Sequence, residues 1–421
     1  MNHYIRTSLI PILVLCIAGQ CNSQSSDIKD AAPTEGHGKQ TELIKNSNGW
    51  GLIGFDSAAT SYNPYEKRIN ADNVGRLKSL WSNRHRSTIR SYVSVIGNTA
   101  YYGTYGGEFL AVETTTGNTI WKKQLHGKHQ GHAVVGKVAY VSSIRRLYAF
   151  VAASGEELWS KPCTSGNFSG PLVSDGVLYV GTSSPAQMRA LATSDGQSLW
   201  AIAGKGSTAV SKGVLYRTLD TFLEAIDAET GKLLWKTADI EGRLTRPAIS
   251  HDVVYIHSTT GKLYAFDAQD RTTQLRTPLW IGSTSLQKSG DAATSPAVAH
   301  GKVFVGANSK FYAFKTDDEV VATKDEVPIR MPVWTADVEA PFFADSPSVA
   351  NGVVFSTAGY YDIYALDAAN GKVLWNFHSR GSKYPMRSKP TIADGRLFHA
   401  ATFGFTLYVF DLPEDAETRG Q

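Results

Sequence analysis

The chain has little cysteine, little net charge and no long hydrophobic run beyond its N-terminus. Only three cysteines occur in 421 residues, and Cys16 and Cys21 lie close to the N-terminus, so Cys163 has no partner for an internal disulfide. Lys and Arg number 42 against 38 Asp and Glu, a balance that gives no basis for nucleic-acid binding, which needs a clustered basic surface. The 38 glycines and the 11% aromatic content exclude a disordered chain or a coiled coil, and they favour a β-rich fold with many turns.

Residues 1–21 have the layout of a secretory signal: a cation at Arg6, an apolar stretch over residues 9–18, and then small and polar residues. The apolar stretch is shorter than the roughly 20 residues needed to span a bilayer. Cys21 follows small residues, as a lipidated cysteine does, although Gln20 departs from that pattern, so a lipid anchor on Cys21 and simple secretion both remain open. We expect an exported monomer, periplasmic or extracellular, that contacts a membrane only through such an anchor.

One pattern recurs along the chain: an aliphatic residue, Tyr-Ala, an aliphatic or aromatic residue, Asp-Ala, a turn with Gly, and then Leu-Trp. The clearest copies span residues 223–235 and 363–375. Eight strands of this type accompany eight tryptophans, which are Trp81, Trp121, Trp159, Trp200, Trp235, Trp280, Trp334 and Trp375. Their spacings of 35 to 54 residues are close to the roughly 40–50 residues of a four-stranded propeller blade. Since a tryptophan recurs in every repeat, we expect these side chains to dock one blade on the next.

The strands and the tryptophans are offset by one along the chain. Trp81 precedes the first strand, and the last strand, around Phe410, has no tryptophan after it. This offset predicts a ring in which the N-terminal strand around Trp81 completes the sheet of residues 391–411. We therefore predict an all-β fold, an eight-bladed β-propeller of four-stranded antiparallel blades closed by an N-terminal strand. The chain then divides into a signal peptide (1–21), a flexible polar linker (22–47), the propeller (48–412) and a C-terminal tail (413–421).

The repeat resembles the PQQ-binding-like repeat of quinoprotein alcohol dehydrogenases and of the outer-membrane assembly lipoproteins that share it. The resemblance covers nearly all of residues 50–411. Residues 50–56 (WGLIGFD), followed by 62–64 (YNP), are similar to the start of polyvinyl-alcohol-dehydrogenase-like quinoproteins. The resemblance implies the cofactors PQQ and calcium and the oxidation of an alcohol.

The residues that would carry this chemistry are incomplete. In the dehydrogenases a strand like residues 177–184 is followed by an acidic pair that supplies a calcium ligand, and by adjacent cysteines that form a disulfide near the quinone. Here Pro185 follows Ser184, and neither an acidic pair nor adjacent cysteines occur before Trp200. Calcium takes six to eight oxygen ligands, and we cannot assemble that set. We therefore predict no metal site and assign no catalytic residue, and no cofactor is certain.

The loops expected on one face of the ring carry cations that form a candidate site for a cofactor or another anion. These residues are Arg90, His132, Lys205, Arg246, Arg387 and Lys389. Converging cations would suit a tricarboxylate quinone or an acidic sugar, whereas dispersed cations would form a solvated rim. His126, His129 and His132 are spaced by three, and because a strand alternates faces we expect that they do not meet at one zinc ion.

Three functions are open. The intact repeat without the calcium and disulfide residues favours a non-catalytic exported scaffold that binds a protein partner or a small anionic ligand at the channel mouth. The N-terminal segment and the cationic face favour a PQQ-dependent alcohol dehydrogenase that passes electrons to a separate acceptor. The basic and aromatic mouth alone would suit an acidic-polysaccharide-binding propeller.

Overall fold

The computed structural model places most of the chain from Gly49 onward. The residues described are 49–89, 91–163, 166–269, 275–284, 293–317, 322–324, 327–338, 346–358, 362–378, 388–401 and 405–413. The predicted signal peptide and linker lie outside this set, as do Cys21, Arg90, Arg387 and most of the predicted tail.

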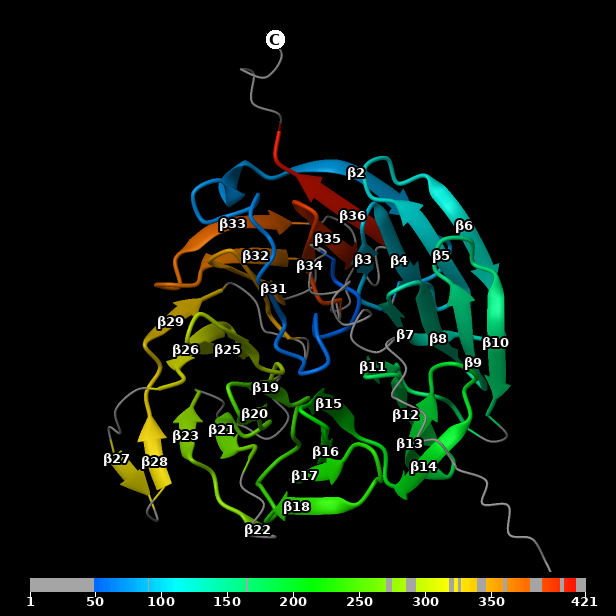
Figure 1. The fold of residues 1–421 in the computed structure, drawn as a ribbon. Coiled ribbons are helices and arrows are strands. Elements are labelled where there is room, and N and C mark those ends of the chain that lie inside the picture. The colour runs from blue at the N-terminus through cyan, green and yellow to red at the C-terminus, as the bar shows by residue number, and fades with distance from the viewer. Residues whose placement is uncertain are drawn as a thin grey trace, which may run out of the picture. The chain divides into compact units, whose positions relative to one another are not determined.

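Eight sheets follow one another around a ring (Figure 1), which confirms the predicted eight-bladed propeller. Blade 1 consists of β3 (Ser94–Ile96), β4 (Thr99–Gly103), β5 (Glu108–Glu113) and β6 (Thr119–Gln124). Blade 2 consists of β7 (His129–Val135), β8 (Val138–Ser143), β9 (Arg146–Val151) and β10 (Glu157–Pro162). Blade 3 consists of β11 (Leu172–Ser174), β12 (Val177–Ser183), β13 (Ala186–Ala192) and β14 (Ser198–Ala203). Blade 4 consists of β15 (Ser207–Ser211), β16 (Val214–Leu219), β17 (Phe222–Asp227) and β18 (Leu233–Thr237).

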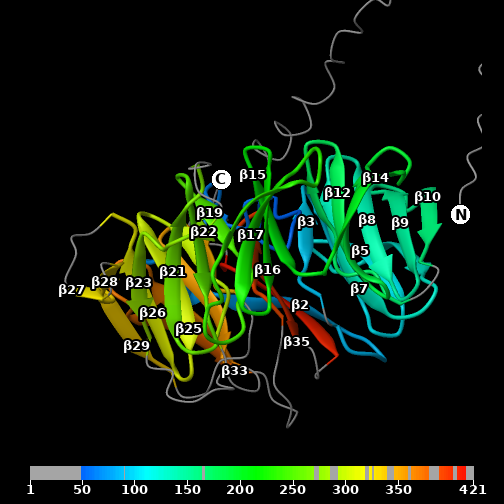
Figure 2. The same cartoon turned by 90° about the horizontal axis from the view of Figure 1, so that it is seen from below.

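The second half of the ring repeats this arrangement, and the view from below shows its strands standing side by side (Figure 2). Blade 5 consists of β19 (Ala248–Ser250), β20 (Val253–His257), β21 (Lys262–Asp267) and β23 (Trp280–Ser283). Blade 6 consists of β24 (Ala297–Ala299), β25 (Lys302–Ala307), β26 (Lys310–Lys315) and β29 (Trp334–Asp337). Blade 7 consists of β30 (Ser348–Ala350), β31 (Val353–Ala358), β32 (Asp362–Asp367) and β33 (Val373–His378), with β1 (Tyr62–Asn63) added to β30.

Blade 8 closes the ring. It consists of β34 (Thr391–Ala393), β35 (Arg396–Ala401), β36 (Thr406–Asp411) and the N-terminal strand β2 (Lys78–Arg84). β2 pairs antiparallel with β36, and Trp81 lies opposite Val409, which confirms the closure predicted from the offset of strands and tryptophans. In the described part of the chain, the 3-10 turn η1 (Val74–Arg76) is the one helix, and no helix there is long and apolar enough to cross a membrane.

The tryptophans of five blades pack on the turn of the following blade. Trp200 donates from Nε1 to the carbonyl oxygen of Ala228 at 3.0 Å, and its ring lies so close to Gly231 that a Cβ there would be 2.8 Å from Cδ2. Gly231 has φ +73°, a backbone conformation that favours glycine. The same contact joins Trp81 to Gly117, Trp121 to Gly155, Trp159 to Gly196, and Trp334 to Gly371.

Two blades use an arginine in place of this glycine, because the turns that follow them are expanded. β22 (Leu275–Arg276) pairs in parallel with β18, and the guanidinium of Arg276 lies 5.2 Å from the ring centroid of Trp235. β28 (Val327–Arg330), which forms a hairpin with β27 (Ala322–Lys324), pairs in parallel with β23, and Arg330 lies 4.7 Å from Trp280. Each expanded turn thus returns to the preceding blade and covers its tryptophan through a cation–π contact.

Candidate functional site

Residues 50–63, which we call the plug segment, run through the middle of the ring (Figure 1). Six plug carbonyls accept hydrogen bonds of 2.7–2.9 Å from one backbone N–H on the innermost strand of each of six blades. The donors are Val95, Val134, Val210, Ile249, Val298 and Val349. In blade 8 the direction is reversed, and Asn63 Nδ2 donates to the carbonyl oxygen of Ile392 at 2.9 Å. The plug segment is therefore hydrogen-bonded to seven of the eight blades.

Lys389 fixes the plug segment from the blade 8 side. Its ammonium donates to Ser61 Oγ at 2.6 Å and lies 5.3 Å from the ring centroid of Trp50. Trp50 is itself buried, with an edge-to-face contact to Phe55 at 5.3 Å. Because Lys389 is only 3% exposed, its charge acts inside the channel rather than at the surface.

A cavity of about 220 Å³, which we call the channel chamber, lies where the inner strands begin. It brings together three of the six candidate residues: His132, Arg246 and Lys389 line it. Lys205 is exposed and is not part of this lining, and Arg90 and Arg387 lie outside the described residues. The remaining polar lining consists mainly of hydroxyl groups, from Ser91, Tyr92, Ser169, Ser207 and Thr208.

His132 is a buried polar side chain of the chamber. Its ring stacks on Tyr92 with centroids 4.7 Å apart, and the Tyr92 hydroxyl donates to the His132 carbonyl oxygen. Nδ1 lies 3.3 Å from His129 Nε2, whereas Nε2 is buried without a hydrogen-bond partner among the described residues. Burial lowers the pKa of His129 to about 3 and that of His132 well below its usual range, so both imidazoles are neutral at pH 7.

The contact between these two histidines differs from the alternation expected of a strand. Their side chains meet because the pairing of β7 with β8 shifts register between His129 and Gly131. A β-bulge of this kind inserts one residue and places positions three apart on the same face. His126 is not part of this contact; its backbone N–H donates to the Tyr148 hydroxyl oxygen at 2.9 Å.

The charge of Arg246 reaches into the chamber. Burial raises the pKa of Tyr92, and the positive charge of Arg246 opposes that rise. The chamber therefore combines two cationic side chains, a neutral histidine and several hydroxyl groups. These groups suit a small anion through charge-assisted hydrogen bonds.

The chamber fits a quinone with calcium poorly. Its described lining contains no carboxylate, whereas calcium usually takes several. Within the described residues, no group of three or more His, Cys, Asp or Glu side chains is placed to hold a metal ion. The chamber is also smaller than the roughly 300–1,000 Å³ of most ligand pockets.

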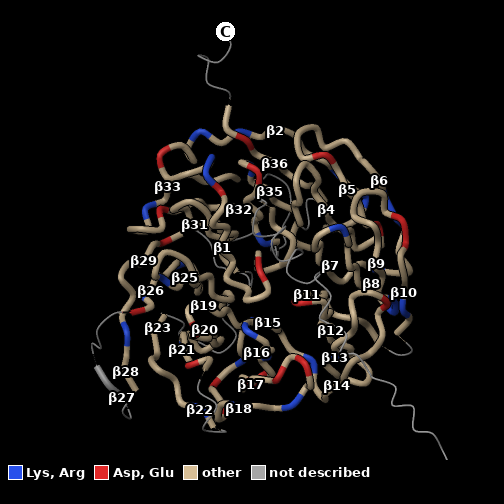
Figure 3. Tube along the Cα trace, viewed as in Figure 1, with Lys and Arg blue, Asp and Glu red and all other residues tan. Residues whose placement is uncertain are grey.

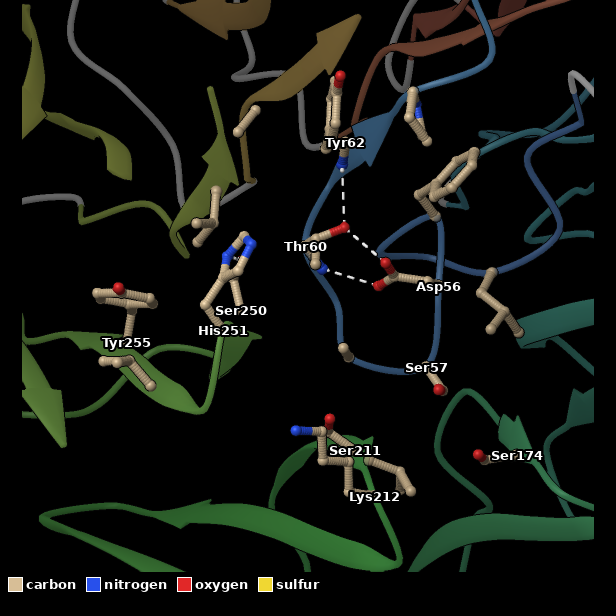
Figure 4. A pocket seen from close by; sticks show the side chains of 18 of the residues that line it. Asp56, Ser57, Thr60, Tyr62, Ser174, Ser211, Lys212, Ser250, His251 and Tyr255 are labelled. Carbon is tan, nitrogen blue, oxygen red and sulfur yellow. Dashed lines mark hydrogen bonds between the residues drawn. The ribbon is translucent and has the colours of Figure 1, made fainter. Parts of the chain in front are cut away.

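A larger cavity of about 1000 Å³, which we call the turn-face pocket, lies at the opposite ends of the inner strands. Its floor is the plug segment, including Asp56, Thr60 and Tyr62, and its rim is formed by the turns that follow the inner strands (Figure 4). Asp56 accepts hydrogen bonds from the Thr60 N–H at 2.9 Å and the Thr60 hydroxyl at 2.7 Å. Desolvation nevertheless raises the pKa of Asp56 to about 6, against the lowering effects of Thr60 and of the Lys389 charge.

Our sequence analysis did not identify the residues of the turn-face pocket. The missed signal is the first residue of the turn after each inner strand, which is polar or charged in blades 3 to 8. In four of these blades it lines the pocket, as Asp175, Lys212, His251 and His300. All four have φ between +47° and +51°, a conformation that L-residues other than Asn and Asp rarely adopt. If the repeats are aligned on this turn, these four residues fall at the same position of the repeat.

Charge of both signs is distributed around the ring, without a face of one sign in this view (Figure 3). Within the described residues, several of the exposed charges form ion pairs, such as Lys122 with Glu108 at 3.1 Å and Lys310 with Asp337 at 3.0 Å. The two cavities are therefore the places where charge is concentrated in a confined space.

Comparison with curated proteins gives relatives of several kinds. The chain is 29% identical over 174 residues to the outer membrane protein assembly factor BamB of Yersinia pestis, covering 40% of this chain and 42% of that protein. It is 25% identical over 327 residues to a tetrathionate hydrolase of Acidithiobacillus ferrooxidans, covering 66% and 64%. It is 27% identical over 213 residues to a quinohemoprotein alcohol dehydrogenase of Comamonas testosteroni, covering 47% and 27%. The chain thus spans less than two thirds of the length of each of these relatives.

Solved structures share the fold at low sequence identity. A europium-containing methanol dehydrogenase superposes with a TM-score of 0.68 and 14% identity, over 89% of this chain and 100% of that chain. BamB from Moraxella catarrhalis superposes with a TM-score of 0.59 and 16% identity, over 80% and 99%.

A family model described as outer membrane protein assembly factor BamB matches residues 107–216, 204–329 and 317–418. Together these matches cover most of the chain and include the repeats that led to the predicted resemblance, which they confirm. The chain therefore belongs to the PQQ-repeat propeller family whose model is described as outer membrane protein assembly factor BamB.

Proposed function

We propose that this protein is a non-catalytic binding propeller whose channel chamber takes a small anion. The observation that carries the proposal is the convergence of His132, Arg246 and Lys389 on a chamber whose described lining contains no carboxylate. Two cations there provide the attraction, and the buried setting strengthens it relative to water.

The hydroxyl groups of the chamber supply direction. Ser169, Ser207 and Thr208 line the same space as Arg246 and Lys389. Each hydroxyl can donate one hydrogen bond to an anion oxygen. An anion attracted by the two cations would therefore also accept hydrogen bonds from this wall.

The relatives support a binding role of this kind. The assembly factors among them are named for assembly rather than for a reaction. Another relative is named for its action on tetrathionate, which is a small anion. Together with the signal-like residues 1–21, the outer-membrane name of the assembly factors supports an exported location for this protein.

The proposal is tested by calorimetric titration of the purified protein with tetrathionate, with sulfate, and with PQQ in the presence and absence of calcium. We expect one molecule of a small anion to bind per chain and PQQ not to bind. Arg246→Gln should weaken anion binding about tenfold or more, since a hydrogen bond to a charged group contributes about 1.5–3 kcal/mol. Arg243→Gln is the matched control, because Arg243 lies on the same loop but is exposed and outside the lining.

Turnover assays complete this test. Calcium-dependent PQQ binding with dye-linked oxidation of an alcohol would replace the proposal with the dehydrogenase alternative. Breakdown of tetrathionate would keep the anion site but contradict the non-catalytic role. Equal anion affinity in the Arg246 and Arg243 variants would remove the chamber as the site.

A protein partner on the rim is the second candidate, favoured by aliphatic side chains exposed on or just before the outer strands, close to the tryptophans. They are Leu80, Ile120, Leu158, Leu199, Leu233, Leu279, Val333 and Val373. Each blade thus presents one exposed aliphatic side chain at the rim, which a partner spanning adjacent blades could contact. A photo-crosslinker at position 158 should then capture one defined partner, and a crosslinker at Glu157, the preceding residue on the same strand, should capture it less.

A further inference from the structure

Among the described residues, blade 3 is the one blade of the eight that the plug segment does not hydrogen-bond, and its free edge faces the turn-face pocket. Each of the six donors named above is the last residue but one of its innermost strand, as Val210 is in β15, where it lies opposite Leu215. Val173 holds the same place in β11, opposite Leu178. Its N–H therefore points toward the channel like the others, yet no carbonyl of the described plug segment accepts from it.

The Val173 N–H has no plug carbonyl as its partner because of the path that the plug segment takes past blade 3. Gly51 is hydrogen-bonded to blade 2 and Ser57 to blade 4, and residues 52–56 pass blade 3 without a backbone hydrogen bond to it. Leu52 belongs instead to a hydrophobic cluster with residues of blades 2, 3 and 4. The space left beside Val173 is part of the turn-face pocket, which Val173 and Ser174 both line.

We propose that the turn-face pocket binds an extended peptide segment with basic and aliphatic side chains, whose backbone carbonyl accepts from the Val173 N–H. The chain itself shows this mode of binding, because the plug segment adds β1 in parallel to the innermost strand β30, with Tyr62 opposite Val349. A peptide on β11 would repeat that addition at the blade to which the plug segment is not hydrogen-bonded in the described part of the chain. Adding a strand to a free sheet edge is a common way of binding peptides.

The charged side chains around the pocket would favour a peptide that carries positive charge. Three acidic residues line it: Asp56, Asp175 and Asp317. Lys212, the lysine of the rim, is already paired with Asp252 at 2.6 Å. His251 contacts Ser250 Oγ through Nδ1 at 2.9 Å, and His300 packs edge-on against Tyr62 at 5.0 Å.

The walls between these charges are apolar and would hold the aliphatic side chains. They come from valines near the ends of the inner strands of blades 2, 3, 4 and 6, which are Val135, Val173, Val210 and Val298. A strand bound along this edge would alternate its side chains between the valine wall and the charged rim. This proposal concerns a different cavity from the channel chamber, so either one can fail without the other.

The test uses a fluorescent, acetylated and amidated pentapeptide, lysine–valine–threonine–valine–lysine, and a version with glutamate in place of lysine. Fluorescence anisotropy with the purified protein should show binding of the lysine peptide and at least tenfold weaker binding of the glutamate peptide. Val173→Pro removes the N–H at a position where no ladder bond depends on it. It should weaken the lysine peptide about tenfold, the upper range for one hydrogen bond.

Asp175→Asn provides a second variant that is compatible with the positive φ of this turn. It should weaken the lysine peptide about threefold, as expected for one partly screened charge. Asp394→Asn is the matched control, because Asp394 occupies the same turn position in blade 8 with φ +52° but does not line the pocket. Equal binding of both peptides, or equal effects of the Asp175 and Asp394 variants, would overturn the proposal. Weaker peptide binding in Arg246→Gln would point to the channel chamber and would also overturn it.

Discussion

The buried histidines are the residues whose chemistry departs most from that of the free side chain. His399 is completely buried in β35, and neither ring nitrogen has a hydrogen-bond partner within the described part of the chain. Burial lowers its pKa to about 3, against about 6.5 in the unfolded chain. The folded protein therefore keeps this ring neutral while the unfolded chain takes up a proton as the pH falls below about 6.5.

This difference predicts a pH-dependent gain from His399→Phe. A group with a lowered folded pKa contributes full stability above about pH 6.5 and loses it progressively toward about pH 3. At pH 5 the loss at His399 is about 2 kcal/mol, from about 1.5 pH units at about 1.36 kcal/mol each. We expect the free energy of unfolding of the variant to exceed that of the wild type by about 2 kcal/mol more at pH 5 than at pH 7.5, measured by urea denaturation at both values.

His257→Phe is a comparison at neutral pH. Burial also lowers the pKa of His257, to about 4, so its pH-dependent gain should be similar to that of His399→Phe. His257 is also buried, but its Nδ1 lies 3.0 Å from the Thr294 carbonyl oxygen, so the phenyl ring would leave that oxygen without its partner. The variant should lose stability at pH 7.5, where His399→Phe should not. A His399 variant whose stability changes equally at both pH values would show that the ring does not titrate as described.

Single residues also mark the limit of what the sequence could predict. The cationic set was identifiable from its loops, but only the structure shows that His132, Arg246 and Lys389 share a chamber while Lys205 stays exposed. Loop paths decide which side chains meet, and these paths depend on packing rather than on local pattern. The β-bulge between His129 and Gly131 is a similar case, because one unpaired residue reverses the face of every later side chain.

At the scale of elements, a tryptophan of one blade packs against a glycine of the next in five blades, and we predict that this contact docks the blades. Gly231→Ala would place a methyl group 2.8 Å from Trp200 in a residue with φ +73°. We expect a loss of about 2–5 kcal/mol in unfolding free energy, combining the left-handed conformation with overpacking. Thermal and urea unfolding of the purified variant measure it.

Gly213→Ala separates the two contributions. Gly213 lies in the same blade with φ +72°, and a Cβ there would meet nothing within 4 Å. It should therefore lose only the conformational part, about 1–2 kcal/mol. Equal losses in the two variants would mean that the tryptophan moves aside without a penalty and does not hold the blades together.

The regular elements were predictable and the irregular ones were not, for a physical reason. The repeat fixes strands and turns through local alternation and turn residues, so the blades and the closing strand β2 follow from the pattern. β22 and β28 lie in expanded turns without that pattern, and they are strands only because a blade edge and a tryptophan receive them. The plug segment binds through its backbone carbonyls. Every residue type has such a carbonyl, so the amino-acid sequence does not reveal these contacts.

At the scale of the whole molecule, the ring depends on the seam between β2 and β36, where strands from the two ends of the described chain pair. Ser82 lies opposite Tyr408 across this seam, although nearly the whole propeller separates them in sequence. A disulfide from Ser82→Cys and Tyr408→Cys, in a Cys163→Ser background, should stabilise the ring strongly because it closes a very long loop. The difference in unfolding free energy between the oxidised and reduced forms measures its effect.

A serine and a tyrosine also lie opposite each other on adjacent strands within blade 2, and this pair provides a matched control. Ser160 lies opposite Tyr148 on the neighbouring strand of one hairpin, so a disulfide there would close only a short loop. Loop-closure entropy predicts that the seam disulfide stabilises by about 3 kcal/mol more than the blade 2 disulfide. Equal stabilisation would show that the unfolded chain already holds its two ends together.

The plug segment has a consequence for how this chain could change its number of repeats. A propeller is assembled from similar blades, so a ring that gained or lost one blade could still close through its outer strands. In this chain one continuous segment (50–63) meets seven inner strands in order, each at its own position. An added or deleted blade would shift every later contact by one, so duplication here must be matched by a change in the plug segment. Blade 3, the unit without such a backbone contact in the described chain, is therefore the place where the ring could best tolerate a repeat being lost or inserted.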